Sequence, residues 1–147
     1  MNTNLDFCLA LYRAHASLQL KLDDELGTYH GISFSDFALL NVIARSDGDR
    51  INISVLVNKM GKPQSAVVRQ LIALEKIGLV TRDSNNGLRQ VVLRPPGRVL
   101  VNVARETVES VGIKATESLT PAVVATVFAA MITLADAQYD SRSTLRG

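Results

Sequence analysis

The residues of this sequence best suited to chemistry are cations gathered in one stretch. Between positions 59 and 98 the chain carries eight Lys and Arg but only two acidic residues. The rest of the chain has eight basic and twelve acidic residues and is therefore net acidic, although the whole 147-residue protein has a charge of only +2. Such a cluster could neutralise the phosphates of a nucleic acid, whereas a solvated basic face would need no partner. The cations are Lys59, Lys62, Arg69, Lys76, Arg82, Arg89, Arg94 and Arg98.

Other chemistry finds little support in the sequence. There is no glycine-rich phosphate loop, no nucleophile elbow and no metal-ligand spacing. Cys8 and His15 would lie two helical turns apart, about 10 Å, which is too far for direct proton transfer. One cysteine and two histidines exclude a disulfide framework and make a zinc site a poor fit. We therefore predict no enzyme, no metal and no cofactor.

The cations lie within a regular succession of helices and strands. Apolar spacing and caps at Ser35 and Asn52 predict helices, and Asn86-Gly87 between two apolar runs predicts a β-hairpin. The expected helices span 4–27, 36–45, 52–60, 63–77, 97–117 and 121–139. The expected strands span 50–51, 79–82 and 88–93.

A short helix, a turn at Gly61, a second helix and a hairpin form a winged helix-turn-helix, whose second helix enters the major groove of DNA. The expected fold is therefore mainly α with a small β wing. The stripe Val67, Leu71 and Leu74 should face the core, so the opposite positions should face DNA. Gln64 could pair with adenine, Arg69 could bind guanine or a phosphate, Val68 could touch a thymine methyl, and Ser65 and Lys62 could hold phosphates.

The stretches 61–69 (GKPQSAVVR) and 74–82 (LEKIGLVTR), with the strand exit 91–97 (VVLRPPG), resemble the MarR-type winged-helix transcription regulators. The resemblance covers nearly the whole chain. It implies one domain, with a DNA-binding part at 32–96 and helical dimerisation parts at 1–31 and 97–147. It also implies a cytoplasmic homodimer that binds a pseudo-palindromic operator in double-stranded DNA, usually as a repressor released by a small molecule or an oxidant.

The wing departs from this family at its tip. The family's Asp-x-Arg, whose arginine enters the minor groove, is replaced here by Asn85-Asn86-Gly87. Arg89 and Arg82 are the candidates to take over the contact. The departure also keeps open a winged helix used for protein–protein contact, although the basic residues favour DNA.

Two kinds of sensor fit the remaining residues. Cys8 followed by Tyr12 resembles the hydroperoxide-sensing branch of the family, but Leu22 and Phe34 stand where that branch has tyrosines. We therefore favour a buried, inert Cys8 over a redox-active one. The family's commoner device is an effector pocket between the terminal helices and the wing domain, which Tyr12, His15, Phe34 and Phe37 could line.

The stretch 118–135 contains no charged residue and approaches the length of a membrane span. Its threonines and alanines dilute the apolarity, and Thr120-Pro121 is typical of a helix start. We predict a helix buried on most of its circumference at a dimer interface, with no membrane contact. The first residues do not resemble a signal peptide either, because Asp6 and Arg13 interrupt them.

Overall fold

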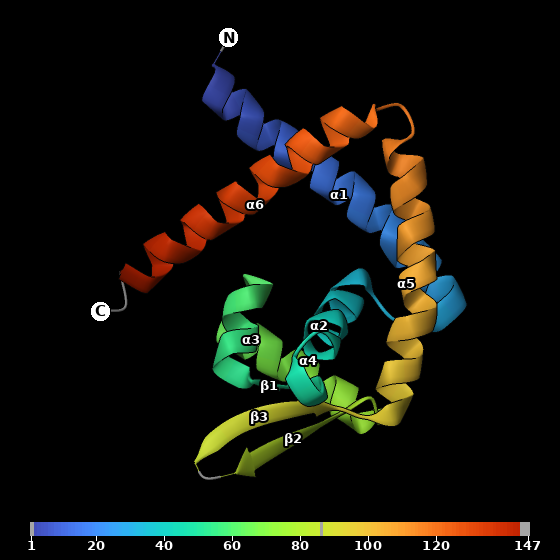
Figure 1. The fold of residues 1–147 in the computed structure, drawn as a ribbon, viewed down its shortest axis with the longest axis vertical. Coiled ribbons are helices and arrows are strands. Elements are labelled where there is room, and N and C mark those ends of the chain that lie inside the picture. Colours follow the sequence, from blue (N-terminus) through green and yellow to red (C-terminus); the bar gives the residue numbers. More distant parts are fainter. Residues whose placement is uncertain (1, 86, 145–147) are drawn as a thin grey trace.

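The computed structural model describes residues 2–85 and 87–144, which form six α-helices and a three-stranded sheet (Figure 1). The α-helices are α1 (Thr3–His30), α2 (Phe34–Ala44), α3 (Ile53–Met60), α4 (Gln64–Lys76), α5 (Pro95–Thr116) and α6 (Pro121–Thr144), and a 3-10 turn, η1, covers Asp47–Asp49. The strands are β1 (Arg50–Asn52), β2 (Val80–Asn85) and β3 (Leu88–Leu93). The predicted mainly α fold with a small β wing is confirmed.

Helix boundaries follow local caps, with three corrections. α1 continues past Gly27 to His30, and Gly31, with its left-handed backbone (φ 69°), caps the end of the helix. Ser33, not Ser35, caps α2, because its hydroxyl accepts the Asp36 N–H at 3.0 Å. α5 begins at Pro95 rather than 97, since the first turn of a helix needs no internal N–H donors.

The sheet places the wing beside the helix-turn-helix. All pairs are antiparallel, and β3 lies between β1 and β2. The register pairs Arg82 with Val91 and Ser84 with Arg89. Since directly paired residues share a face of a sheet, and Val91 is fully buried, Arg82 and Arg89 lie on the face that turns toward the core.

The core lies between α2, α3 and α4 on one side and the sheet on the other. Its fully buried members include Leu40 and Ile43 of α2, Leu56 of α3 and Leu71 of α4, closed from below by Val91 of β3. Every buried residue in the described ranges is apolar or glycine. This core holds the helix-turn-helix rigidly, so the opposite surface of α4 is presented to the outside.

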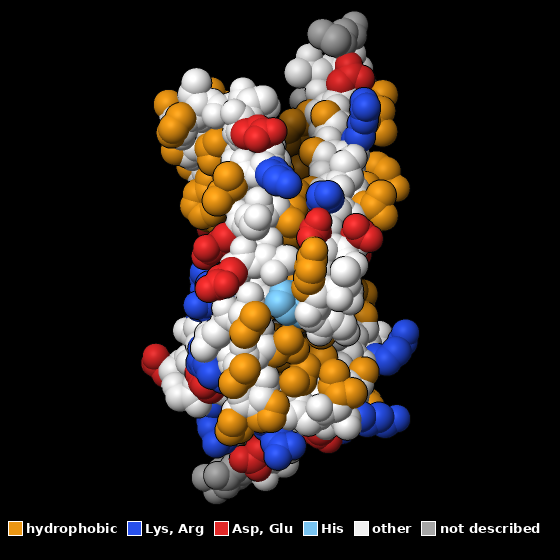
Figure 2. All heavy atoms as spheres, turned by 90° about the vertical axis from the view of Figure 1, so that its right-hand side faces the viewer, with side chains coloured by type: hydrophobic (Ala, Val, Ile, Leu, Met, Phe, Trp, Pro, Cys, Tyr) orange, Lys and Arg blue, Asp and Glu red, His pale blue; other side chains and the backbone are white. Residues whose placement is uncertain are grey.

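The helical arms leave much apolar surface uncovered in the single chain. None of the window Pro121–Gln138 of α6 is buried within this chain, so its burial at a dimer interface stays a prediction. α5 packs on α1, but the N-terminal half of α1 also leaves apolar side chains exposed. Figure 2, which views the molecule from the right-hand side of Figure 1, shows exposed hydrophobic side chains on the upper part of that face. By length and composition alone α6 could cross a membrane, and a single such helix is weak evidence for that.

Candidate nucleic-acid interface

The outward surface of α4 is the centre of the candidate site. Val67, Leu71 and Leu74 are buried, which turns the other side of the helix to solvent. Of the predicted contact residues on this helix, Gln64, Ser65 and Arg69 are exposed, whereas Val68 is half-buried at the edge of the surface.

The sequence reasoning missed two residues on this surface. Ile72 and Lys76 are both exposed, and they follow Arg69 at helical spacings of three and seven residues. The periodicity used for the core stripe could have found them. We call the line Ser65, Arg69, Ile72 and Lys76 the recognition face.

The beginning of α4 is open to an anion. Pro63 occupies the N-cap position and no side chain caps this end of the helix. Uncapped N–H groups at a helix start carry partial positive charge and bind phosphate readily. This geometry suits a DNA backbone at the start of the recognition face.

Lys62 makes a contact within the fold that the sequence did not predict. It is half-buried, and its amine donates to the hydroxyl of Ser35 at the start of α2. Gln70 of α4 donates to the same hydroxyl at 3.1 Å and to the Asp36 carboxylate at 2.8 Å. Lys62 therefore helps to fix α4 against α2 in the single chain, and its contact with a phosphate stays a prediction.

The two candidate wing arginines lie in different settings. Arg82 is held by Glu75 of α4, with 3.3 Å between Nε and the carboxylate. Arg89 is exposed one residue from the strand end at Leu88, nearer the wing tip, and has no ion pair among the described residues. Arg89 is thus the better placed of the two for DNA. The substituted tip at position 86 lies outside the described residues.

Part of the positive charge counted in the sequence is neutralised within the fold. Arg98 pairs with Asp49 and also donates to the Ala44 carbonyl at 3.1 Å. Arg82 pairs with Glu75 at 3.3 Å, whereas Asp83, the other acid of the 59–98 stretch, pairs at 3.2 Å with Arg50, which lies outside that stretch. The cations left exposed include Arg69, Lys76 and Arg89, around α4 and the wing.

The Glu75–Arg82 pair gives a pH-dependent contribution to stability. The Arg82 backbone N–H, at 2.7 Å, and then its guanidinium lower the pKa of Glu75 below its ordinary value. Because the pKa of Glu75 is lower in the folded protein than in the unfolded chain, its ionised carboxylate stabilises the fold at pH values above the unfolded-state pKa. This stabilisation is lost as the pH falls through the folded-state pKa. Because the carboxylate is about one-third exposed, Glu75→Gln should lower the free energy of unfolding by at most about 1 kcal/mol at pH 7.

The difference between Glu75→Gln and the wild type should shrink between pH 7 and about pH 3. Urea unfolding at both pH values measures it, with exposed Glu109→Gln as the control. A deficit that is the same at both pH values would contradict the assigned pair.

The four residues suggested for an effector pocket do not come together in this chain. Tyr12 is 72% exposed and His15 is exposed on α1, whereas Phe37 is in the core and stacks on Phe34 with 6.3 Å between ring centroids. Cys8 is also exposed, so the expectation of a buried cysteine is wrong for the single chain.

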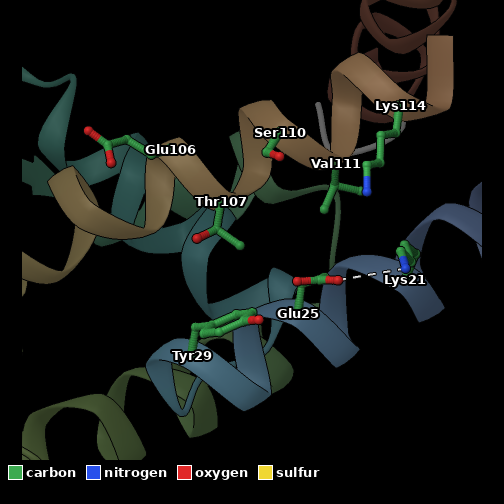
Figure 3. A pocket seen from close by; sticks show the side chains of 8 residues that line it. All are labelled: Lys21, Glu25, Tyr29, Glu106, Thr107, Ser110, Val111 and Lys114. Carbon is green, nitrogen blue, oxygen red and sulfur yellow. Dashed lines mark ion pairs between the residues drawn. The ribbon is translucent and has the colours of Figure 1, made fainter. Parts of the chain in front are cut away.

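A different hollow lies between α1 and α5. One cavity of about 390 Å³ shares Lys21, Val111 and Lys114 with a second of about 360 Å³, and we call the two together the α1–α5 groove. Figure 3 shows Lys21 and Lys114 at the same end of the first cavity, one from each helix. Lys21 pairs with Glu25 at 3.6 Å. The first cavity is lined by Lys21, Glu25, Tyr29, Glu106, Thr107, Ser110, Val111 and Lys114, and the second adds Ala14, Ser17, Leu18 and Ala115.

Polar contacts connect this groove with the DNA-binding part. Asp23 of α1 accepts the Phe34 N–H at 2.7 Å, at the start of α2. The next residue of α2, Ser35, is the one that holds Lys62 and Gln70. At the end of α1, His30 is hydrogen-bonded to Thr107 of α5 at 2.7 Å. Hydrogen bonds therefore join α1 to the first turn of α2, and that turn to Lys62 and Gln70 beside the recognition face.

No family model and no curated protein matches the sequence. Solved structures do match. Sco3205, a MarR family transcriptional regulator from Streptomyces coelicolor in complex with DNA, is 20% identical with a TM-score of 0.83, covering 93% of this chain and 89% of that one. A MarR mutant from E. coli complexed with operator DNA is 20% identical with a TM-score of 0.80, covering 90% and 96%.

CouR from Rhodococcus jostii RHA1, bound to p-coumaroyl-CoA, is 19% identical with a TM-score of 0.81, and the match covers 88% of this chain and 91% of that chain. The likeness in all three cases extends over both the winged helix and the helical arms. The resemblance drawn from the sequence is confirmed for the architecture. The chain has the winged-helix fold of the MarR family transcriptional regulators.

Proposed function

We propose that this protein is a sequence-specific DNA-binding transcription regulator without enzymatic activity, and that it acts in the cytoplasm as a repressor. The observation that carries the proposal is the recognition face. A rigid core presents Ser65, Arg69 and Lys76 on an uncapped helix, and Arg89 extends from the wing on the sheet face that turns toward the core. Cations at this spacing suit the major groove and its phosphates.

Binding to DNA tests the function directly. Fluorescence anisotropy would compare the DNA upstream of the protein's own gene with a scrambled duplex over a salt series. We expect tight binding to the native duplex that weakens steeply with salt, because each phosphate contact releases counterions. If that region lacks the operator, selection from random duplexes supplies a site. Failure to enrich any site would count against the proposal, and would favour a winged helix that contacts protein.

We further propose that the protein works as a homodimer held by α1, α5 and α6. α6 exposes a run of large apolar side chains: Val123, Val127, Phe128, Met131 and Ile132. Leu5, Phe7 and Leu9 add an exposed apolar stretch on α1. Contiguous apolar surface of this kind marks an interface, and a two-fold axis would set two recognition helices about 34 Å apart.

Acidic substitutions in α6 test the dimer. Phe128→Asp with Ile132→Asp should weaken self-association at least about a hundredfold, because charged groups would be buried in an apolar interface. Sedimentation equilibrium measures the change. Ile77→Asp, at an exposed isoleucine after α4, is the control and should leave association unchanged. A double variant that associates as tightly as the wild type would contradict the interface.

The α1–α5 groove is our candidate for the effector site. Lys114 extends into it without an ion pair among the described residues, and Leu18 and Val111 give it an apolar wall. A cation beside apolar surface suits an aromatic carboxylate. The p-coumaroyl-CoA bound to CouR supports the aromatic part of this proposal, although its carboxyl group is joined to CoA as a thioester.

Titration with p-coumarate tests the effector site. The compound should release the wild type from its selected DNA, and Lys114→Met should require about tenfold more of it, because a charge-assisted contact is lost. Arg13→Met, outside the groove, is the matched control. The groove assignment fails if Lys114→Met responds as the wild type does.

A further inference from the structure

Ile72 lies on the outer side of α4 and is not part of the buried core. Its side chain is 38% exposed, while Leu71 before it and Leu74 after it are almost fully buried. At 100° per residue, Ile72 points away from the core on the same side as Arg69 and Lys76. A β-branched apolar residue gains little from such a position in a helix exposed to water.

The surroundings of Ile72 indicate what covers it. Arg69 lies one turn before it and Lys76 one turn after it, both exposed, and Val68 lies half-buried beside it. A protein partner would have to desolvate these two cations, whereas DNA would pair them with phosphates. The apolar group that DNA offers in its major groove is the C5 methyl of thymine.

We propose that Ile72, supported by Val68, is a specificity-determining residue that reads the C5 methyl group of thymine in the operator. The inference rests on the proposed function, since it requires α4 to lie in the major groove. Ser65 and Ile72 are seven residues apart, about 10 Å along the helix. Ile72 therefore reads a different base pair from the one beside the start of α4.

Removing the methyl group from the DNA gives the sharpest test. A site is first selected from random duplexes with the full-length protein, and each thymine in it is then replaced singly by deoxyuridine, which lacks only the C5 methyl. Wild-type protein should lose about fourfold in affinity at one position in each half-site, the effect of one buried methyl-sized group. With Ile72→Ala, the thymine and deoxyuridine duplexes should bind equally at that position.

The exposed Ile77, which follows α4, is the matched control. Ile77→Ala removes the same type of side chain at a position outside the recognition face. This variant should therefore keep the full preference for thymine over deoxyuridine. Ile72→Ala should melt at the wild-type temperature, because the side chain leaves no cavity in the core. If wild-type protein enriches no site, the proposed function itself fails. If Ile72→Ala binds a selected site and still prefers thymine at every position, the assignment of Ile72 is overturned.

Discussion

Replacing Gly97 with alanine should lower the free energy of unfolding by about 3 kcal/mol, the largest effect we expect from one methyl group. A Cβ at this position would lie 2.3 Å from the carbonyl oxygen of Leu79 and 2.7 Å from Cδ1 of Leu93. The carbonyl cannot easily move, because it accepts the Arg94 N–H at 2.9 Å where the chain passes from β3 into α5. Gly97 is therefore required for close packing between α5 and the wing.

The same helix supplies the control for Gly97→Ala. A Cβ added at Gly112 would meet no neighbouring atom of the described residues within 4 Å, so Gly112→Ala should be neutral or stabilise the protein by up to about 1 kcal/mol. Urea unfolding at one fixed protein concentration would measure both variants, because association affects apparent stability. Equal midpoints for Gly97→Ala and the wild type would show that α5 does not pack as closely as described.

Arg69→Ala should weaken binding to the selected DNA by about 1–3 kcal/mol. Arg69 is exposed within the recognition face and makes no ion pair with any described residue, so its guanidinium is free for a base or a phosphate. If it reads guanine, the preference for the selected site over a scrambled duplex should fall. If it binds a phosphate, affinity should fall equally for both duplexes and the salt dependence should decrease by about one counterion.

Anisotropy titrations over a salt series separate these two outcomes for Arg69. Arg13→Ala removes the same charge from α1, away from α4, and should change neither the affinity nor the site preference by more than a small factor. An Arg69→Ala variant that binds the selected site as tightly as the wild type would be incompatible with α4 as the recognition helix.

Local sequence signals predicted the fold well. The core stripe of α4, the Asn52 cap of α3 and the hairpin around Gly87 were all inferred from the sequence, and the structure has them. Each depends on residues within a few positions of one another, and helical or strand periodicity expresses such short-range relations directly. The boundary errors at Gly27 and Pro95 arose because both residue types are tolerated in particular parts of a helix.

The candidate site was only partly predictable. Helical periodicity predicted that Ser65 and Arg69 face outward, and the same pattern could have identified Ile72 and Lys76. No local sequence signal predicts the hydrogen bond from Lys62 to Ser35, which lies 27 positions earlier. The same holds for the pairing of Arg98 with Asp49, which lies 49 positions away.

By itself, then, the sequence determined the order of the helices and strands, the side of α4 that faces outward and the concentration of cations around the wing. Only the tertiary structure decided which cations stay free, that Tyr12 and His15 lie apart from the Phe34–Phe37 stack, and that α6 is left uncovered. The physical reason is the range of the interactions. Periodicity and caps act within one or two turns of the chain, whereas ion pairs and burial depend on how distant segments pack.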